Sequence, residues 1–139
     1  MAAKKLITVS TTVNLPAHNA WELWTNGNHI IHWHTATPEW HNPTASCDAT
    51  PGGRFNYRME AKDGSMGFDF TGTFTEVEPY KKLNSTLDDG RMVEVVFEEN
   101  DGITTITETF EAEEVNSAEL QQQGWQAILD NYKAYAEGQ

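Results

Sequence analysis

The residues that most restrict the fold lie near the carboxyl terminus, where apolar side chains recur at the 3.6-residue period of an amphipathic helix. Asn116 followed by Glu119 predicts a capping box at its start. Gly124 lies on the apolar side, where a missing side chain lets a neighbouring backbone or a bound molecule approach. Because so wide an apolar face is unstable in water, the upstream chain is expected to form a concave surface that covers it. The apolar stripe consists of Leu120, Trp125, Ile128, Leu129, Tyr132 and Tyr135.

Composition favours a single domain, 1–139, because 38% hydrophobic and 11% aromatic residues in a chain of 139 suffice for one sizeable core. Nine basic against 21 acidic residues give a net charge of -12, which disfavours nucleic acid and anionic membrane surfaces as partners. The amino terminus has no long apolar run typical of a signal peptide or membrane span, so a cytoplasmic location is expected. The expected oligomeric state is a monomer or a homodimer. Cys47, the single cysteine, has no partner for an internal disulfide and is given no role.

The first third of the chain predicts one strand, two short helices and a loop. Alternating apolar residues end at Pro16, and Asn26-Gly27-Asn28 separates two runs with helical spacing. The next segment contains prolines and little periodicity, which is typical of a functional loop. The predicted elements are a strand over 6–13, a helix over 17–24, a second through His29 and Trp33, and a loop over 35–50 with a short strand near 45–48.

From Pro51 onward, strict alternation of apolar and polar residues predicts half-buried strands. Tight turns at Asp63-Gly64, Asp88–Gly90 and Asn100–Gly102 join five such strands into an antiparallel meander. Gly72, opposite large aromatic residues, is expected to let the sheet bend. The expected fold class is therefore α+β, with a curved antiparallel sheet wrapped around the long C-terminal helix and two short helices after the first strand.

Several motifs also carry a resemblance to a known family. They are 20–25 (AWELWT) followed by 29–33, 51–55 (PGGRF), 72–79 (GTFTEVEP) with Leu83, and 124–129. Together they resemble the branch of the START and Bet v 1-like (SRPBCC) superfamily that is named after the activator of the heat-shock protein 90 ATPase. The resemblance covers nearly the whole chain. It implies a helix-grip fold with an internal cavity.

The aromatic residues of the strands and the last helix either fill an ordinary core or line a ligand cavity. A curved sheet gripped by one helix tends to leave space, and a mainly apolar pocket with a few polar groups is the usual ligand site. Cavity lining is therefore the favoured interpretation. The predicted ligand-binding residues are Trp33, His34, Trp40, His41, Phe55, Tyr57, Phe68, Phe70, Glu108, Gly124, Trp125 and Leu129.

Glu108 shares a strand face with Ile106 and Phe110, whose apolar side chains are expected to point inward. A carboxyl group on that face would be buried, which is costly without a partner and raises its pKa. Glu108 is therefore the candidate polar anchor or catalytic base. The alternative is that it lies at a solvated open end of the strand.

Histidines cluster near Trp33 and Trp40, but their spacing matches no zinc motif, so neither a metal nor another cofactor is predicted. His34 and His41 are instead expected at the cavity mouth. The cluster consists of His29, His32, His34 and His41.

No nucleophile, phosphate-loop or dinucleotide motif is present in the sequence. The favoured function is binding of a small hydrophobic or aromatic ligand. One alternative is a cyclase- or hydrolase-like enzyme, which would need Glu108 within hydrogen-bond reach of a histidine, a tyrosine or a bound water. A second alternative is a chaperone-interacting module, which would need an exposed apolar patch.

Overall fold

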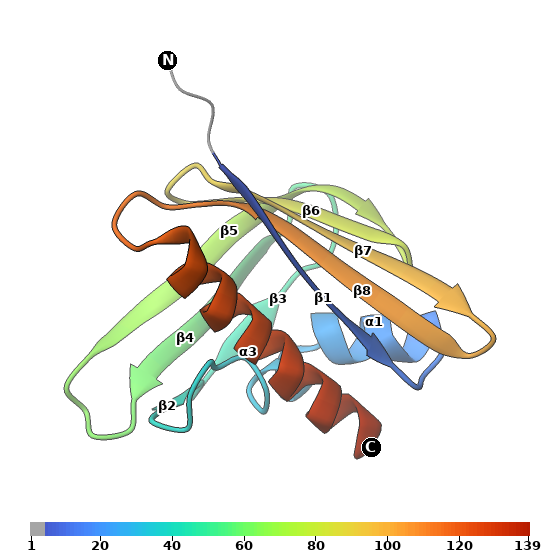
Figure 1. Cartoon of the computed structure of the whole chain (residues 1–139), viewed down its shortest axis with the longest axis horizontal. Coiled ribbons are helices and arrows are strands. Elements are labelled where there is room, and N and C mark those ends of the chain that lie inside the picture. Colours follow the sequence, from blue (N-terminus) through green and yellow to red (C-terminus); the bar gives the residue numbers. More distant parts are fainter. Residues whose placement is uncertain (1–4) are drawn as a thin grey trace.

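The computed structural model describes residues 5–139 and has the expected α+β architecture, a curled antiparallel sheet with a long helix lying across it (Figure 1). The strands are β1 (Leu6–Val13), β2 (Trp40–His41), β3 (Ala45–Cys47), β4 (Arg54–Ala61), β5 (Gly67–Glu78), β6 (Lys82–Leu87), β7 (Met92–Asn100) and β8 (Ile103–Glu111). The helices are α1 (Ala17–Thr25), α2 (Gly27–Ile30) and α3 (Ala118–Glu137).

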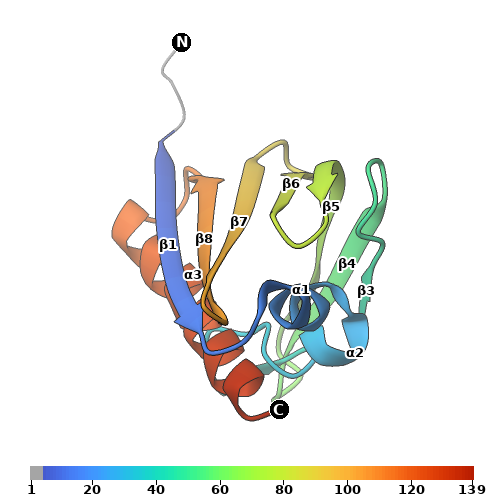
Figure 2. The same cartoon turned by 90° about the vertical axis from the view of Figure 1, so that its right-hand side faces the viewer.

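The sheet follows the order β1-β8-β7-β6-β5-β4-β2, with β3 also paired to β4, and every pairing is antiparallel. The predicted meander is therefore confirmed as β4 through β8. Figure 2 shows how the sheet curls and how α1 and α2 cross one end of it. Asp101 (φ 52°) and Gly102 (φ 80°) make the tight turn between β7 and β8, in the left-handed region that such hairpins require.

Two details of the first third differ from the sequence prediction. The segment expected to be a loop contains β2, in which Trp40 pairs with Ala61 and His41 with Glu60, because the chain returns alongside the end of β4. The second short helix ends at Ile30, and Trp33 lies in the turn that follows. The short strand predicted near 45–48 is confirmed as β3.

The start of α3 also differs from the predicted capping box. Ser117 is the N-cap, and its hydroxyl accepts a 3.1 Å hydrogen bond from the Leu120 amide. Asn116 lies one residue before the cap, and its side-chain amide donates a hydrogen bond to the Glu113 carboxylate. Leu120, assigned to the apolar stripe, is 55% exposed, so the buried face of the helix begins further along.

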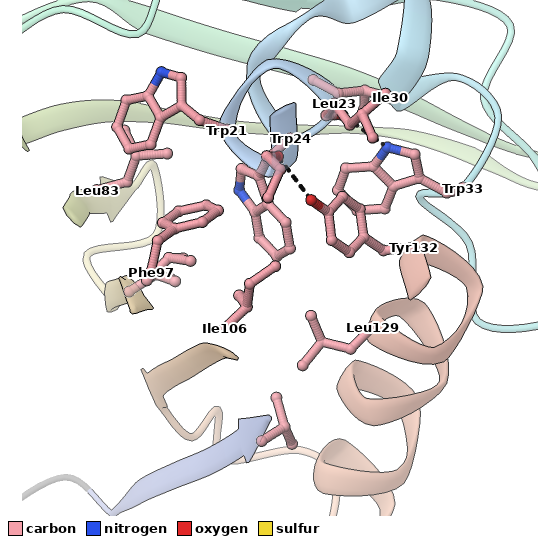
Figure 3. Packing of buried hydrophobic residues seen from close by; sticks show 14 of the residues in the cluster. Trp21, Leu23, Trp24, Ile30, Trp33, Leu83, Phe97, Ile106, Leu129 and Tyr132 are labelled. Atoms are coloured by element: carbon pink, nitrogen blue, oxygen red, sulfur yellow. Dashed lines mark hydrogen bonds between the residues drawn. The ribbon is translucent and has the colours of Figure 1, made fainter. Parts of the chain in front are cut away.

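The far end of α3 is fixed by the aromatic core (Figure 3). Tyr132 is fully buried, and its hydroxyl donates a 2.7 Å hydrogen bond to the carbonyl of Ala20 in α1. Its ring meets those of Trp24 and Trp33 at centroid distances of 5.0 and 4.9 Å. The Trp33 indole N–H donates to the carbonyl of Leu23. These contacts lock α1, the turn after α2 and α3 together at one end of the sheet.

Along its length, α3 covers the edge strand β1. Gln126 donates a 3.0 Å hydrogen bond to the carbonyl of Ser10, and the Lys133 ammonium donates to that of Thr12. An edge strand otherwise presents free carbonyl groups that can pair with another chain. The sheet edge is thus closed by the same helix that covers its inner face.

Two glycines, one tightly enclosed and one open, provide a matched test of packing in the sheet and in α3. A Cβ on Gly72 would lie 2.7 Å from the Phe55 ring and 2.8 Å from the Thr86 carbonyl, whereas a Cβ on Gly124 would have nothing within 4 Å. Gly72→Ala should therefore lower the free energy of unfolding by about 1–3 kcal/mol. Gly124→Ala should raise it by about 0.5–1 kcal/mol, because alanine favours the helix.

Urea denaturation of both variants measures these changes. Equal stability of the Gly72→Ala variant and the wild type would show that the Phe55 ring does not rest against this glycine. The register irregularity of β5 falls between Phe74 and Glu76, and Gly72 allows the Phe55 ring and the Thr86 carbonyl to approach the strand closely.

Candidate functional site

A cavity of about 210 Å³ lies between the concave face of the sheet and α3. Its walls come from the end of α1, from the turn after α2, from strands β4 to β8, and from the middle of α3. The lining residues are Trp24, Trp33, His34, Phe55, Tyr57, Met59, Phe68, Phe70, Phe74, Leu83, Ser85, Leu87, Val93, Val95, Glu108, Trp125 and Ile128.

Trp125 is the main contribution of α3 to the cavity wall. Its indole stacks on Phe110 with ring centroids 3.7 Å apart and meets Phe70 edge-on at 6.2 Å. Phe70 in turn lies 5.8 Å from Phe55 and 6.2 Å from Tyr57. The expectation that Trp125 faces the strand aromatics is thereby confirmed.

Glu108 is buried on the inner face of the sheet, with only 8% of its surface exposed. It pairs with Val9 of β1 on one side and Val95 of β7 on the other, so its neighbours across the sheet are apolar. Burial raises its pKa to about 8, and no hydrogen bond to it is present among residues 5–139. The solvated alternative is therefore wrong, and near neutral pH this carboxyl group is mainly protonated.

His34 is a second ionisable residue of the cavity wall. Its imidazole lies 4.8 Å from the Tyr57 ring and 5.5 Å from the Phe70 ring. Its Nδ1 atom is shielded from solvent and has no hydrogen-bond partner. Burial lowers its pKa to about 4, so the ring is neutral at physiological pH. No hydrogen bond joins His34 to Glu108 among residues 5–139.

Tyr57 also lines the cavity, and the Cys47 thiol lies beside its hydroxyl. Burial raises the pKa of the Tyr57 hydroxyl well above its usual value, with the neighbouring Cys47 thiol and Glu108 adding to the shift. Burial also raises the pKa of Cys47 to about 11. The thiol is therefore protonated near neutral pH, and a protonated thiol is a poor nucleophile.

Four of the predicted site residues do not line this cavity. Trp40 and His41 lie on β2, where Trp40 packs edge-on against Phe68 and His41 is exposed beside Glu60. Leu129 is fully buried and packs in the core near Tyr132 (Figure 3), because its position on α3 points it away from the cavity.

Gly124, the fourth, borders a shallow outer groove between the start of α3 and β5. Phe68, Phe70 and Trp125 line both this groove and the cavity, so the two are adjacent. Phe68 is 47% exposed, which places it at the rim. The remaining predicted residues, Trp33, His34, Phe55, Tyr57, Phe68, Phe70, Glu108 and Trp125, all lie in the cavity wall.

Sequence reasoning missed much of the wall on β6 and β7. Leu83, Ser85, Val93 and Val95 alternate with exposed or half-buried neighbours, so their period-2 pattern already marked them as inward-facing. Ser85 is the one polar member of this group and is 8% exposed. The pattern identified their face but not whether that face met α3 or an open space.

Two histidines of the cluster, His29 and His32, pack against α3. His29 forms a 2.7 Å hydrogen bond with the Tyr135 hydroxyl, and His32 stacks on the same ring at 5.5 Å. Within residues 5–139, no group of His, Cys, Asp and Glu is arranged to hold a metal ion. No helix in that range is long and apolar enough to cross a membrane.

Comparison with known proteins places this geometry in a family. The model of a family described as Activator of Hsp90 ATPase homolog 1-like protein matches residues 14–137. The solution structure of an AHSA1-like protein from Aeromonas hydrophila is 42% identical, with a TM-score of 0.86, over 95% of this chain and 93% of that one. A protein from Cytophaga hutchinsonii is 45% identical, with a TM-score of 0.83, over 95% and 92% of the two chains.

A more distant crystal structure, of a protein from Nitrosomonas europaea, shares only the fold. It is 17% identical with a TM-score of 0.82, and the match covers 99% of this chain and 97% of that one. Among curated proteins, none matches the sequence.

Proposed function

Since this chain belongs to the Activator of Hsp90 ATPase homolog 1-like family of the SRPBCC superfamily, whose fold supports a general binding role, we propose that it binds a small hydrophobic or aromatic ligand. The site is the cavity between the sheet and α3. The observation that carries the proposal is the unfilled space of about 210 Å³, enclosed mainly by aromatic and aliphatic side chains.

The size of the cavity argues for a ligand of one or two rings. Protein interiors normally leave few voids larger than a water molecule. An apolar cavity of roughly 150 Å³ is enough to hold benzene. The space beneath α3 exceeds that volume, so a ring with a short substituent fits without displacement of the walls.

The polar groups of the wall support binding over simple packing. Glu108 and the Nδ1 atom of His34 are buried without partners, and both arrangements cost stability. Unpaired polar groups directed into an apolar pocket are typical of sites where a ligand supplies the missing partner. A solid core would gain stability from apolar residues at these positions.

A cavity-filling substitution tests the proposal. Val95 lines the cavity from β7, and Val95→Phe should place a ring in the space and weaken binding of an apolar fluorescent probe about tenfold or more. Val77→Phe is the matched control, because Val77 is a half-buried strand residue outside the cavity wall. The control should bind the probe as the wild type does.

Probe titration is combined with circular dichroism to establish that each variant is folded. Unchanged probe affinity in a folded Val95→Phe protein would place the probe elsewhere on the molecule. A wild-type protein that binds no apolar probe would contradict the ligand-binding function itself.

A further inference from the structure

We propose that the ligand of this cavity is an arylalkylamine, bound with its ring among the aromatic side chains and its ammonium group paired with Glu108. This inference rests on the binding function proposed above and specifies its ligand class. The cavity wall contains one carboxyl group and several aromatic rings, and its described residues include no lysine or arginine.

The described residues of the cavity wall include an acidic side chain but no lysine or arginine. Glu108 is the only acidic residue in the lining, and none of the described lining residues is a lysine or an arginine. A carboxylate ligand would therefore face Glu108 with no cation to bind it. An ammonium group would instead find a carboxyl group that has no hydrogen-bond partner among residues 5–139 and that becomes its counter-charge by releasing a proton.

Aromatic rings surround the same space and favour a cation. The rings of Phe55, Tyr57, Phe70 and Trp125 form a continuous series of contacts across the cavity wall. The face of an aromatic ring is negative, so a cation positioned over it is attracted, most strongly where water is excluded. These rings also provide stacking surfaces for the ring of the ligand.

The electrostatic field of the whole chain acts in the same direction. A net charge of -12 raises the local concentration of cations and speeds their encounter with the protein. This long-range attraction is not specific by itself. It adds to the local pairing at Glu108, whereas an anionic ligand would be disfavoured at both levels.

Glu108 is the group in the cavity wall whose protonation should change when an amine binds, because the groups that face it do not titrate between pH 6 and 8. Val9 and Val95 flank it across the sheet and do not titrate. Across the cavity, His34 has a pKa of about 4 and the pKa of Tyr57 is raised well above its usual range, so both remain neutral between pH 6 and 8. Ammonium binding should therefore displace a proton from the Glu108 carboxyl group to the solvent.

The test uses calorimetric titration with phenethylamine, phenethyl alcohol and phenylacetate, which share a ring and differ in charge. The amine should bind at least about tenfold tighter than the alcohol at pH 8, and phenylacetate should bind weakest. Amine affinity should rise by up to about tenfold per pH unit between pH 6 and 7, with release of about one proton. Titrations in buffers of different ionisation enthalpy measure that proton.

Glu108→Gln is the control that assigns these effects to one side chain. It should remove both the preference for the amine over the alcohol and the proton release. If this variant does not fold, proton release by the wild type still decides the matter. Absence of proton release on amine binding would overturn the inference.

The result also separates this inference from the proposed function. Suppose that phenethyl alcohol binds more tightly than both charged compounds and that Val95→Phe prevents its binding. The cavity then binds neutral aromatic compounds, and the amine assignment is wrong. If none of the three compounds binds and the apolar probe also fails, both proposals are wrong.

Discussion

Tyr132→Ala is expected to lower the free energy of unfolding by about 4 kcal/mol, a large part of the stability of a domain of this size. Tyr132 is fully buried, packs against Trp24 and Trp33, and bonds to the carbonyl of Ala20. Truncation removes the ring, leaves a cavity where three helical segments meet, and breaks the hydrogen bond. Chemical denaturation monitored by tryptophan fluorescence measures the loss.

Two conservative variants separate packing from hydrogen bonding. Tyr132→Phe keeps the ring and removes a buried hydrogen bond, so it should cost about 1 kcal/mol. Tyr135→Phe removes the part-buried bond to His29, which water can replace, and should cost less than about 0.5 kcal/mol. A Tyr132→Ala protein as stable as the Tyr135→Phe variant would contradict the structure of this end of the core.

Glu108→Gln is expected to stabilise the protein at pH 8 and to remove a pH dependence that the wild type has. The pKa of Glu108 rises from 4.5 to about 8 on folding, so the folded state holds a proton that the unfolded state has lost. This contribution to stability is fully present below pH 4.5 and is lost as the pH rises through 8. The slope is about -1.4 kcal/mol per pH unit between those values.

His34 opposes this slope at lower pH. Its pKa falls from 6.5 to about 4 on folding, so its contribution to stability increases as the pH rises from 4 to 6.5. The two contributions nearly cancel between pH 4.5 and 6.5. Between pH 6.5 and 8 only the Glu108 contribution remains, and wild-type stability should fall by about 2 kcal/mol.

Urea denaturation at pH 6.5 and pH 8 measures the change. The Glu108→Gln variant should show little change between these pH values, because glutamine does not titrate. An equal decline in the variant and the wild type would show that Glu108 is not the group that titrates. A Glu108→Gln protein less stable than the wild type at pH 8 would indicate a structural partner for this carboxylate.

Periodicity alone determined most of the fold. Strict alternation in 54–61 and 103–111 located β4 and β8, and the 3.6-residue pattern located α3, because side-chain direction follows directly from backbone geometry. The same rule placed Glu108 on the inner face with Ile106 and Phe110. Motifs near Trp21 and Gly72 indicated the family, and the fold of that family predicted how these elements are arranged.

Only the tertiary structure decided which inward residues meet empty space. Leu129 and Ile128 both belong to the apolar stripe of α3, yet Leu129 packs in the core and Ile128 lines the cavity. Gly124, predicted to border the ligand, faces the outer groove. Periodicity gives the direction of each side chain, but a cavity is the small volume left when elements distant in sequence pack together, and that volume depends on the curl of the sheet and the position of α3 across it.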